Sequence, residues 1–100
     1  MAYKIGQVVL SNPTDCYQVQ NGNYSINGTP TNASAEIYNQ YGIYNLSHFG
    51  IQSRPGAVFA IDDEVIIIGR SGSYELSNNL VAVNNLQLLS ADTFIIDFKY

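Results

Sequence analysis

The chain has 100 residues, of which 46% are hydrophobic and only 12% are charged, and its net charge is −4. This length fits one domain, residues 1–100, with a modest core. The scattered basic residues form no stripe that would neutralise nucleic-acid phosphates, so we expect no nucleic-acid partner. The longest apolar run is far shorter than the roughly 20 residues of a spanning helix, and the amino terminus lacks a signal pattern, so we expect a soluble protein with no membrane partner.

The first third of the chain predicts two strands and a polar segment. Tyr3 to Leu10 predicts a strand, in which Gly6 indicates a bulge or a close backbone approach. Turn formers follow, and then Cys16 to Gln20 alternates as a short strand. Asn21 to Ser34 contains two Asn-Gly pairs and almost no large apolar residues. It predicts either a hairpin with a long polar tip or an extended arm.

The next segment is ambiguous between helix and strand. In Ala35 to Gly42, Ile37 and Tyr41 fit a helical spacing of four, while the Tyr and Ile content favours a strand. We predict a strand here, and another within Ile43 to Ile51.

A hairpin is predicted between Ala57 and Ile68. Ala57 to Ile61 is an apolar run, Asp62-Asp63-Glu64 supplies turn formers, and Val65 to Ile68 is a β-branched run that suits a strand buried on both faces. Gly69 and Gly72 then flank a loop in which we expect positive φ or a close backbone approach.

The last third predicts a turn at 77–79, one or two strands within Leu80 to Leu88, and a final strand from Thr93 to Tyr100. In the final strand, Phe94, Ile96 and Phe98 alternate with Ile95 and Asp97 and give one strongly aromatic face. Seven to nine short strands without a convincing amphipathic helix predict an all-β domain, a compact antiparallel β-sandwich or jelly-roll-like fold. A small β-barrel is the alternative.

No residue set predicts catalysis, a cofactor or a metal. Cys16 is the only cysteine and reads as a small buried apolar residue, since a catalytic thiol needs a basic partner and His48 stands in a segment without a motif. We read His48 as an edge or interface residue, because no further ligand stands at metal spacing. Asp62-Asp63-Glu64 lacks the spacing of a calcium loop, and turn chemistry accounts for it. We therefore expect a protein that is not an enzyme.

Tyrosine is abundant, with eight residues in the chain. It gives a large contact area at a small entropy cost, so an interface role is attractive, as is the stacking of sugar rings. The structural alternative is half-buried tyrosines at strand ends with hydrated hydroxyls. The candidate interface residues are Tyr17, Tyr24, Tyr38, Tyr41, Tyr44, Arg70, Tyr74 and Tyr100.

The second half of the chain, Gly50 to Tyr100, resembles a β-domain of structural proteins from tailed phages and phage-tail-like particles of Gram-positive bacteria. The resemblance is carried by Gly69 to Leu76, GRSGSYEL, which matches a recurrent Gly-Arg-(Ser/Thr)-Gly-x-Tyr-Glu-Leu block, and by the terminal FIIDFKY. It implies a virion or tail component and no catalytic role, without indicating the position on the particle.

Two functional hypotheses follow. The first is a structural subunit of the virion that assembles with its own copies or with a larger capsid or tail protein. Lysines on edge strands discourage pairing between sheets, and this chain has few of them, so its β edges are available for contact. The second is a module on a baseplate or fibre that binds a host cell-wall glycan.

Overall fold

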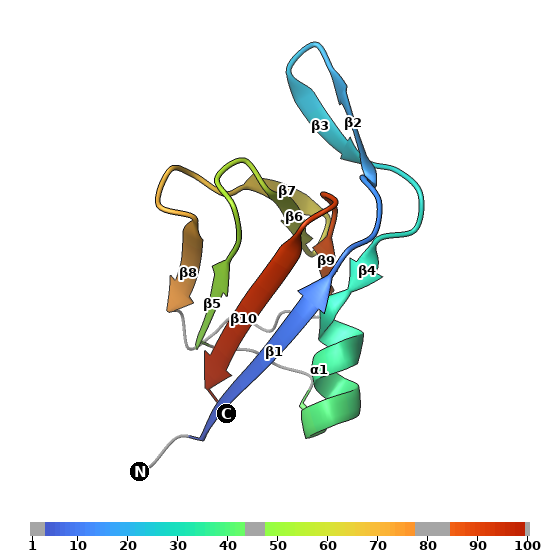
Figure 1. Cartoon of the computed structure of the whole chain (residues 1–100). Coiled ribbons are helices and arrows are strands. Elements are labelled where there is room, and N and C mark those ends of the chain that lie inside the picture. Colours follow the sequence, from blue (N-terminus) through green and yellow to red (C-terminus); the bar gives the residue numbers. More distant parts are fainter. Residues whose placement is uncertain (1–3, 44–47, 78–84, 100) are drawn as a thin grey trace.

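The computed structural model describes residues 4–43, 48–77 and 85–99, and in these ranges the chain forms ten strands and one helix (Figure 1). The first sheet has the order β1-β10-β5-β8 and the second β4-β9-β6-β7, while β2 and β3 form a separate hairpin. All pairings are antiparallel. The elements are β1 (Ile5–Ser11), β2 (Tyr17–Gln20), β3 (Asn23–Ile26), β4 (Thr31–Asn32), α1 (Ala33–Tyr41), β5 (His48–Gln52), β6 (Val58–Ile61), β7 (Glu64–Ile67), β8 (Ser73–Ser77), β9 (Leu86–Leu88) and β10 (Thr93–Lys99).

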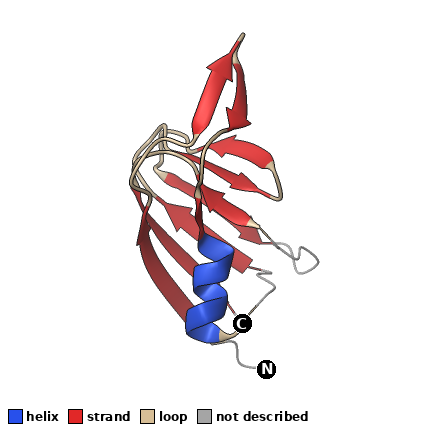
Figure 2. Ribbon diagram, turned by 90° about the vertical axis from the view of Figure 1, so that its right-hand side faces the viewer, coloured by secondary structure: helices blue, strands red, loops and turns tan. Residues whose placement is uncertain are grey.

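The predicted all-β, sandwich-like fold is confirmed. The main core contains inward side chains of both four-stranded sheets together with two residues of α1; its large buried members include Ile37, Phe49, Ile51, Phe59, Leu86, Leu88, Phe94, Ile96 and Phe98. The helix lies beside β1 and below β4 (Figures 1 and 2). The number of strands in the described residues, ten, is higher than the predicted seven to nine, because the polar segment itself contributes β3 and the two-residue β4.

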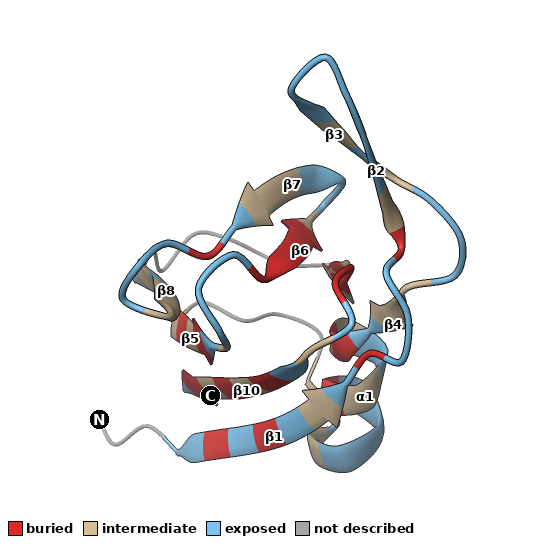
Figure 3. Ribbon diagram, turned by 45° about the horizontal axis from the view of Figure 1, so that its top comes forward, coloured by how far each residue is buried: buried red, intermediate tan, exposed pale blue. Residues whose placement is uncertain are grey.

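The final strand has the predicted alternation. Phe94, Ile96 and Phe98 of β10 are buried, and the intervening residues are partly exposed (Figure 3). Gly6 lies directly opposite Phe98 in an unbroken register, so β1 has no bulge there. The close approach is made by a ring: a Cβ on Gly6 would lie 2.5 Å from Phe98 Cε2 and 3.1 Å from Tyr41 Cε1.

The strand predicted over 35–42 is wrong, because this segment belongs to α1. The Asn32 side chain caps the helix by accepting a hydrogen bond from the Ala35 N–H, and Gly42 ends it with a φ of 72°. Ala33, Ile37 and Tyr41, spaced by four, share the face that packs on the core. Tertiary packing of this face outweighs the strand propensity of Tyr and Ile.

The β6–β7 hairpin is confirmed, with a two-residue turn at Asp62 and Asp63, whose φ values are 47° and 72°. A left-handed backbone conformation at both residues is what a type I′ turn requires. Glu64, which was predicted as a turn former, is the first residue of β7. The prediction that 65–68 is buried on both faces is wrong, because β7 is an edge strand and Ile67 is 45% exposed. β6, which lies between β9 and β7, has no exposed residue on either face, and neither does β9.

Other local predictions are corrected or fall partly outside the described residues. Gly72 has a φ of 71°, and a Cβ there would lie 2.9 Å from the Ser53 carbonyl oxygen, whereas Gly69 has neither constraint. Ser77 ends β8 instead of opening a turn. The predicted turn at 78–79, the predicted strand residues at 80–84, and residues 3, 44–47 and 100 lie outside the described ranges.

The polar segment begins as a hairpin, the first of its two predicted forms. Asn21 and Gly22 form its two-residue turn with φ values of 54° and 79°, as a type I′ turn requires. The β2–β3 hairpin projects beyond the two sheets (Figures 1 and 2). Its tip is therefore short, and residues 27–30 connect it to β4.

Candidate functional site

The base of the β2–β3 hairpin packs on the outer face of the second sheet. Paired positions place Tyr17, Val19, Tyr24 and Ile26 on one face of the hairpin and the polar residues on the other. A second buried cluster, separate from the main core, joins this face to β6; it contains Cys16, Val58, Ala60 and Leu89, with Tyr17, Tyr24, Ile26 and Val65 packed against it. The second sheet is thus covered on both faces.

A buried asparagine fixes the hairpin base to the body. Asn12 is 3% exposed, and its Nδ2 donates to the Thr14 and Ser90 carbonyl oxygens at 2.7 and 3.0 Å. Its Oδ1 accepts from the Thr31 N–H and Oγ1 at 3.3 and 2.9 Å. The hairpin is therefore held rigidly at its base, while its tip extends into solvent.

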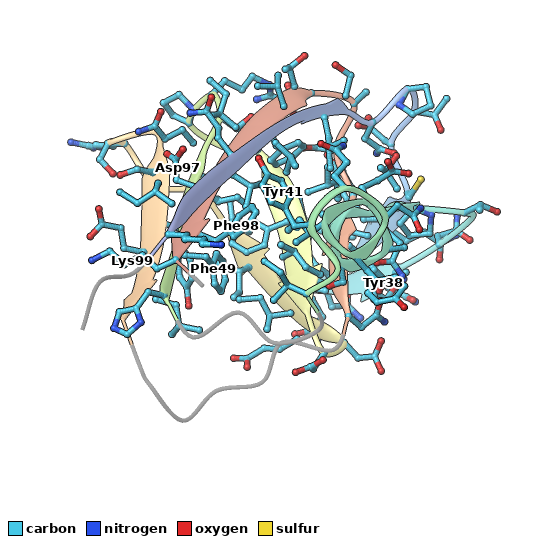
Figure 4. The ribbon with its side chains drawn as sticks, turned by 90° about the horizontal axis from the view of Figure 1, so that it is seen from below. Tyr38, Tyr41, Phe49, Asp97, Phe98 and Lys99 are labelled. Carbon is cyan, nitrogen blue, oxygen red and sulfur yellow. The ribbon has the colours of Figure 1, made fainter. Side chains whose placement is uncertain are left out.

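The described tyrosines of the candidate interface are largely parts of the scaffold. Tyr17 and Tyr24 contact one another with ring centroids 5.6 Å apart, and Tyr74 packs edge-on against the Phe59 ring at 5.3 Å. Tyr41 does the same against Phe98 at 5.0 Å (Figure 4). All four are partly buried.

Tyr38 and Arg70 are the exposed members of the candidate set. Tyr38 lies on the side of α1 away from Tyr41 (Figure 4), and Arg70 lies in the turn after β7. Tyr44 and Tyr100 lie outside the described residues. The structure thus does not gather the predicted residues into one surface.

Exposed apolar side chains on β-strands are the feature that sequence reasoning missed. Ile5 and Val9 on β1 are 76% and 59% exposed, Val19 at the hairpin tip is 53% exposed, and Ile67 on β7 is 45% exposed. Strand alternation was a usable signal for β1, but the exposure of Ile67 depends on the position of β7 at a sheet edge, which is a nonlocal property.

Edge strand β1 alternates apolar and polar side chains on its outward face. Ile5, Gln7, Val9 and Ser11 face outward, and Val9 lies opposite the partly buried Ile95 of β10. Its seven residues pair with β10 without a bulge, and the strand contains neither lysine nor proline. Proteins commonly use those devices to prevent edge-to-edge association.

A hollow of about 290 Å³ lies on the outer face of the first sheet, above Gly50 of β5. Asp97 of β10 and Glu75 of β8 are the cross-strand neighbours of Gly50, and Gln52 and Ser73 line the same hollow. Gly50 leaves the space because it has no side chain. Asp97 Oδ1 accepts a hydrogen bond from Gln7 Nε2 at 2.7 Å.

The residues considered for catalysis or metal binding are not brought together. Cys16 is buried beneath the hairpin, where its thiol donates to the Thr14 carbonyl at 3.4 Å, while His48 lies on β5 of the other sheet. Since β5 lies inside its sheet, the expected edge position of His48 is wrong. Asp62 Oδ1 accepts the Asn85 N–H at 3.1 Å, as a turn residue does. In residues 4–43, 48–77 and 85–99, no three His, Cys, Asp or Glu side chains form a metal-binding group.

Comparison with protein-family models, curated proteins and solved structures finds no match to this chain. Within the described ranges, no helix is long and apolar enough to cross a membrane.

Proposed function

We propose that this protein is a non-enzymatic structural subunit that assembles with its own copies or with a larger protein through exposed β-strand surfaces. The observation that carries the proposal is a pair of exposed apolar side chains on the outward face of edge strand β1, Ile5 and Val9, which are 76% and 59% exposed. Burying such side chains stabilises an assembly by about 25 cal/mol per Å² of apolar surface removed from water. A net charge of only −4 opposes association weakly.

At Gln7, the described contacts leave no backbone group of the β1 edge available for pairing with another strand. There the Tyr41 hydroxyl hydrogen-bonds to the backbone N–H and carbonyl of Gln7. Because this leaves the outward side chains of Ile5 and Val9 uncovered, we favour contact through the face of β1 over strand addition along its edge.

Placement in a virion rests on the resemblance of Gly69 to Leu76. In this fold the segment has a scaffold role: Gly72 permits close approach to Ser53, and Tyr74 and Leu76 pack against the main core. The residues of this block have packing and turn roles. Such roles are those expected of a structural protein, and the motif has no catalytic group. The partner we propose is another copy of the chain or a capsid or tail protein.

Light scattering coupled to size-exclusion chromatography across a range of concentrations tests assembly. We expect a defined oligomer whose mass falls in the Ile5→Ser/Val9→Ser variant and is retained in a Gln18→Ser/Gln20→Ser control on the polar face of the hairpin. A monomer at every concentration that also fails to bind particle proteins would contradict the proposal. Immunogold labelling of phage particles from a host that carries the gene tests the location.

The hollow above Gly50 favours glycan binding as the second candidate. Its carboxylate, amide and hydroxyl side chains, from Asp97, Glu75, Gln52 and Ser73, are groups that hydrogen-bond sugar hydroxyls. Its volume lies near the lower limit of ordinary ligand pockets, about 300 Å³. A cell-wall polysaccharide screen tests this candidate, and Gly50→Val, which fills the hollow, should abolish any binding. Binding that survives this change would locate the glycan elsewhere.

A further inference from the structure

The outer edge of β7 has backbone groups available for another strand. The Ile68 N–H donates to the Ala57 carbonyl at 2.8 Å, and the Ile68 carbonyl accepts from the Gly56 N–H at 2.8 Å, so both groups face the β6 side. Along an antiparallel strand this direction alternates from residue to residue. Val65 and Ile67 therefore direct their N–H and carbonyl groups away from β6, and β6 is the only described strand that pairs with β7.

The side chains of these two residues form the rim of an existing apolar cluster. Val65 lies opposite Ala60, and Ile67 lies opposite Val58. The side chains of Ala60 and Val58 are buried in the cluster beneath the β2–β3 hairpin. Val65 packs against this cluster and is partly buried, whereas Ile67 remains 45% exposed. An additional strand beside β7 would continue the sheet and cover Ile67.

Opposite charges stand at the two ends of β7. The acidic residues Asp62, Asp63 and Glu64 lie at its start, and Arg70 lies three residues past its last residue, Ile67. Asp63, Glu64 and Arg70 are exposed and form no ion pair with any residue that the structure describes. An antiparallel neighbour of the same sequence brings the acidic end of each strand to the basic end of the other.

We propose that β7 pairs antiparallel with β7 of a second copy of this chain, about a two-fold axis at Ile66. In this register Val65 lies opposite Ile67 of the other copy, and each such pair exchanges both backbone hydrogen bonds. Glu64 lies opposite Ile68 of the other copy, two residues from Arg70, which is about 7 Å along a strand and within the Debye length of about 8 Å. The inference rests on the proposed assembly function and names one of its interfaces.

Residue-resolved amide exchange by NMR tests the pairing on the full chain. In dilute protein we expect fast exchange at Val65 and Ile67 and slow exchange at Ile66, which faces β6. At high concentration the Val65 and Ile67 amides should become protected while Ile66 changes little. Oligomers in which Val65 and Ile67 still exchange fast would overturn this interface and leave the proposed assembly function standing. A monomer at all concentrations would also overturn the interface, and a monomer that in addition fails to bind particle proteins would contradict both.

Two further outcomes would also overturn the inference. Protection of Val65 and Ile67 in dilute monomer would mean that the chain covers its own edge. Protection that appears only after a particle protein is added would mean that the occupant is not a second copy.

Variants give an independent test. Ile67→Lys should raise the dimer dissociation constant by about tenfold or more, because a lysine on an edge strand opposes pairing. The matched control, Gln18→Lys on the polar face of the β2–β3 hairpin, should leave β7 pairing unchanged. Protection of Val65 and Ile67 that persists in Ile67→Lys at wild-type concentrations would count against the interface.

A charge exchange tests the orientation. Arg70→Glu and Asp63→Lys/Glu64→Lys chains should each dimerise weakly, and a mixture of the two should form a heterodimer, since opposite charges then meet at both ends. Failure of the mixture to associate, with both chains folded, would rule out the antiparallel register.

Discussion

The Tyr41 hydroxyl hydrogen-bonds to both backbone groups of Gln7: it accepts the Gln7 N–H at 3.3 Å and donates to the Gln7 carbonyl at 3.1 Å. A residue of α1 therefore takes the place that a neighbouring strand would take at the centre of the β1 edge. The Tyr41 ring packs edge-on against Phe98, so the same side chain also covers one end of the main core.

Tyr41→Phe removes these hydrogen bonds and keeps the ring. We expect the free energy of unfolding to fall by about 0.5–1.5 kcal/mol, the usual net value of a hydrogen bond. Denaturant titration measures the change. We also expect stronger self-association, because the Gln7 backbone groups become available at the β1 edge. Unchanged stability and unchanged association would show that the hydroxyl neither stabilises nor protects this edge.

Gly6→Ala introduces a methyl group where the Phe98 ring lies. The new Cβ would be 2.5 Å from two ring carbons, so the ring or the strand has to move. Overpacking of this kind typically costs about 1–3 kcal/mol, and thermal unfolding should detect it. Gly50→Ala is the matched control, since the nearest atom to its Cβ is Glu75 Cγ at 3.9 Å. Equal stability of the two variants would refute the packing argument.

Asn12→Asp tests the polar connection beneath the hairpin. Nδ2 of Asn12 donates to two carbonyl oxygens, and a carboxylate places an acceptor against those acceptors. Leaving such buried groups unsatisfied costs about 1–3 kcal/mol or more when a charge is involved, so we expect substantial destabilisation measured by denaturant. Asn23→Asp, at an exposed position of β3, is the control. Comparable effects at both positions would contradict a special role for Asn12.

Local patterns predicted the β6–β7 hairpin and β10, because alternation and turn chemistry act over a few residues. They did not predict α1. Its apolar spacing was visible at Ile37 and Tyr41, but the capping residues Asn32 and Gly42 were needed to decide between helix and strand.

The candidate interface depended on nonlocal information. The tyrosines form no common surface among the described residues. Tyr17 packs against the second buried cluster, while Tyr41 and Tyr74 pack against two different rings of the main core. Whether the β-branched run at 65–67 is buried depends on the order of strands in the sheet, and β7 is at its edge. The sequence contains no local signal for that order, so Ile67 could not be identified before the structure.

Asp63→Gly tests the turn that presents β7. Asp63 has a φ of 72°. A left-handed conformation costs a residue with a side chain about 1–2 kcal/mol, and glycine removes this strain. Glycine also loses more backbone entropy on folding, which offsets about 0.5–1 kcal/mol of the gain. We therefore expect the free energy of unfolding to rise by roughly 0.5–1 kcal/mol, measured by denaturant titration. Gly22→Ala, at the left-handed position of the β2–β3 turn, should act in the opposite direction because alanine is strained at its φ of 79°. A loss of stability in Asp63→Gly would show that the Asp63 carboxylate contributes more to the turn than its backbone strain removes.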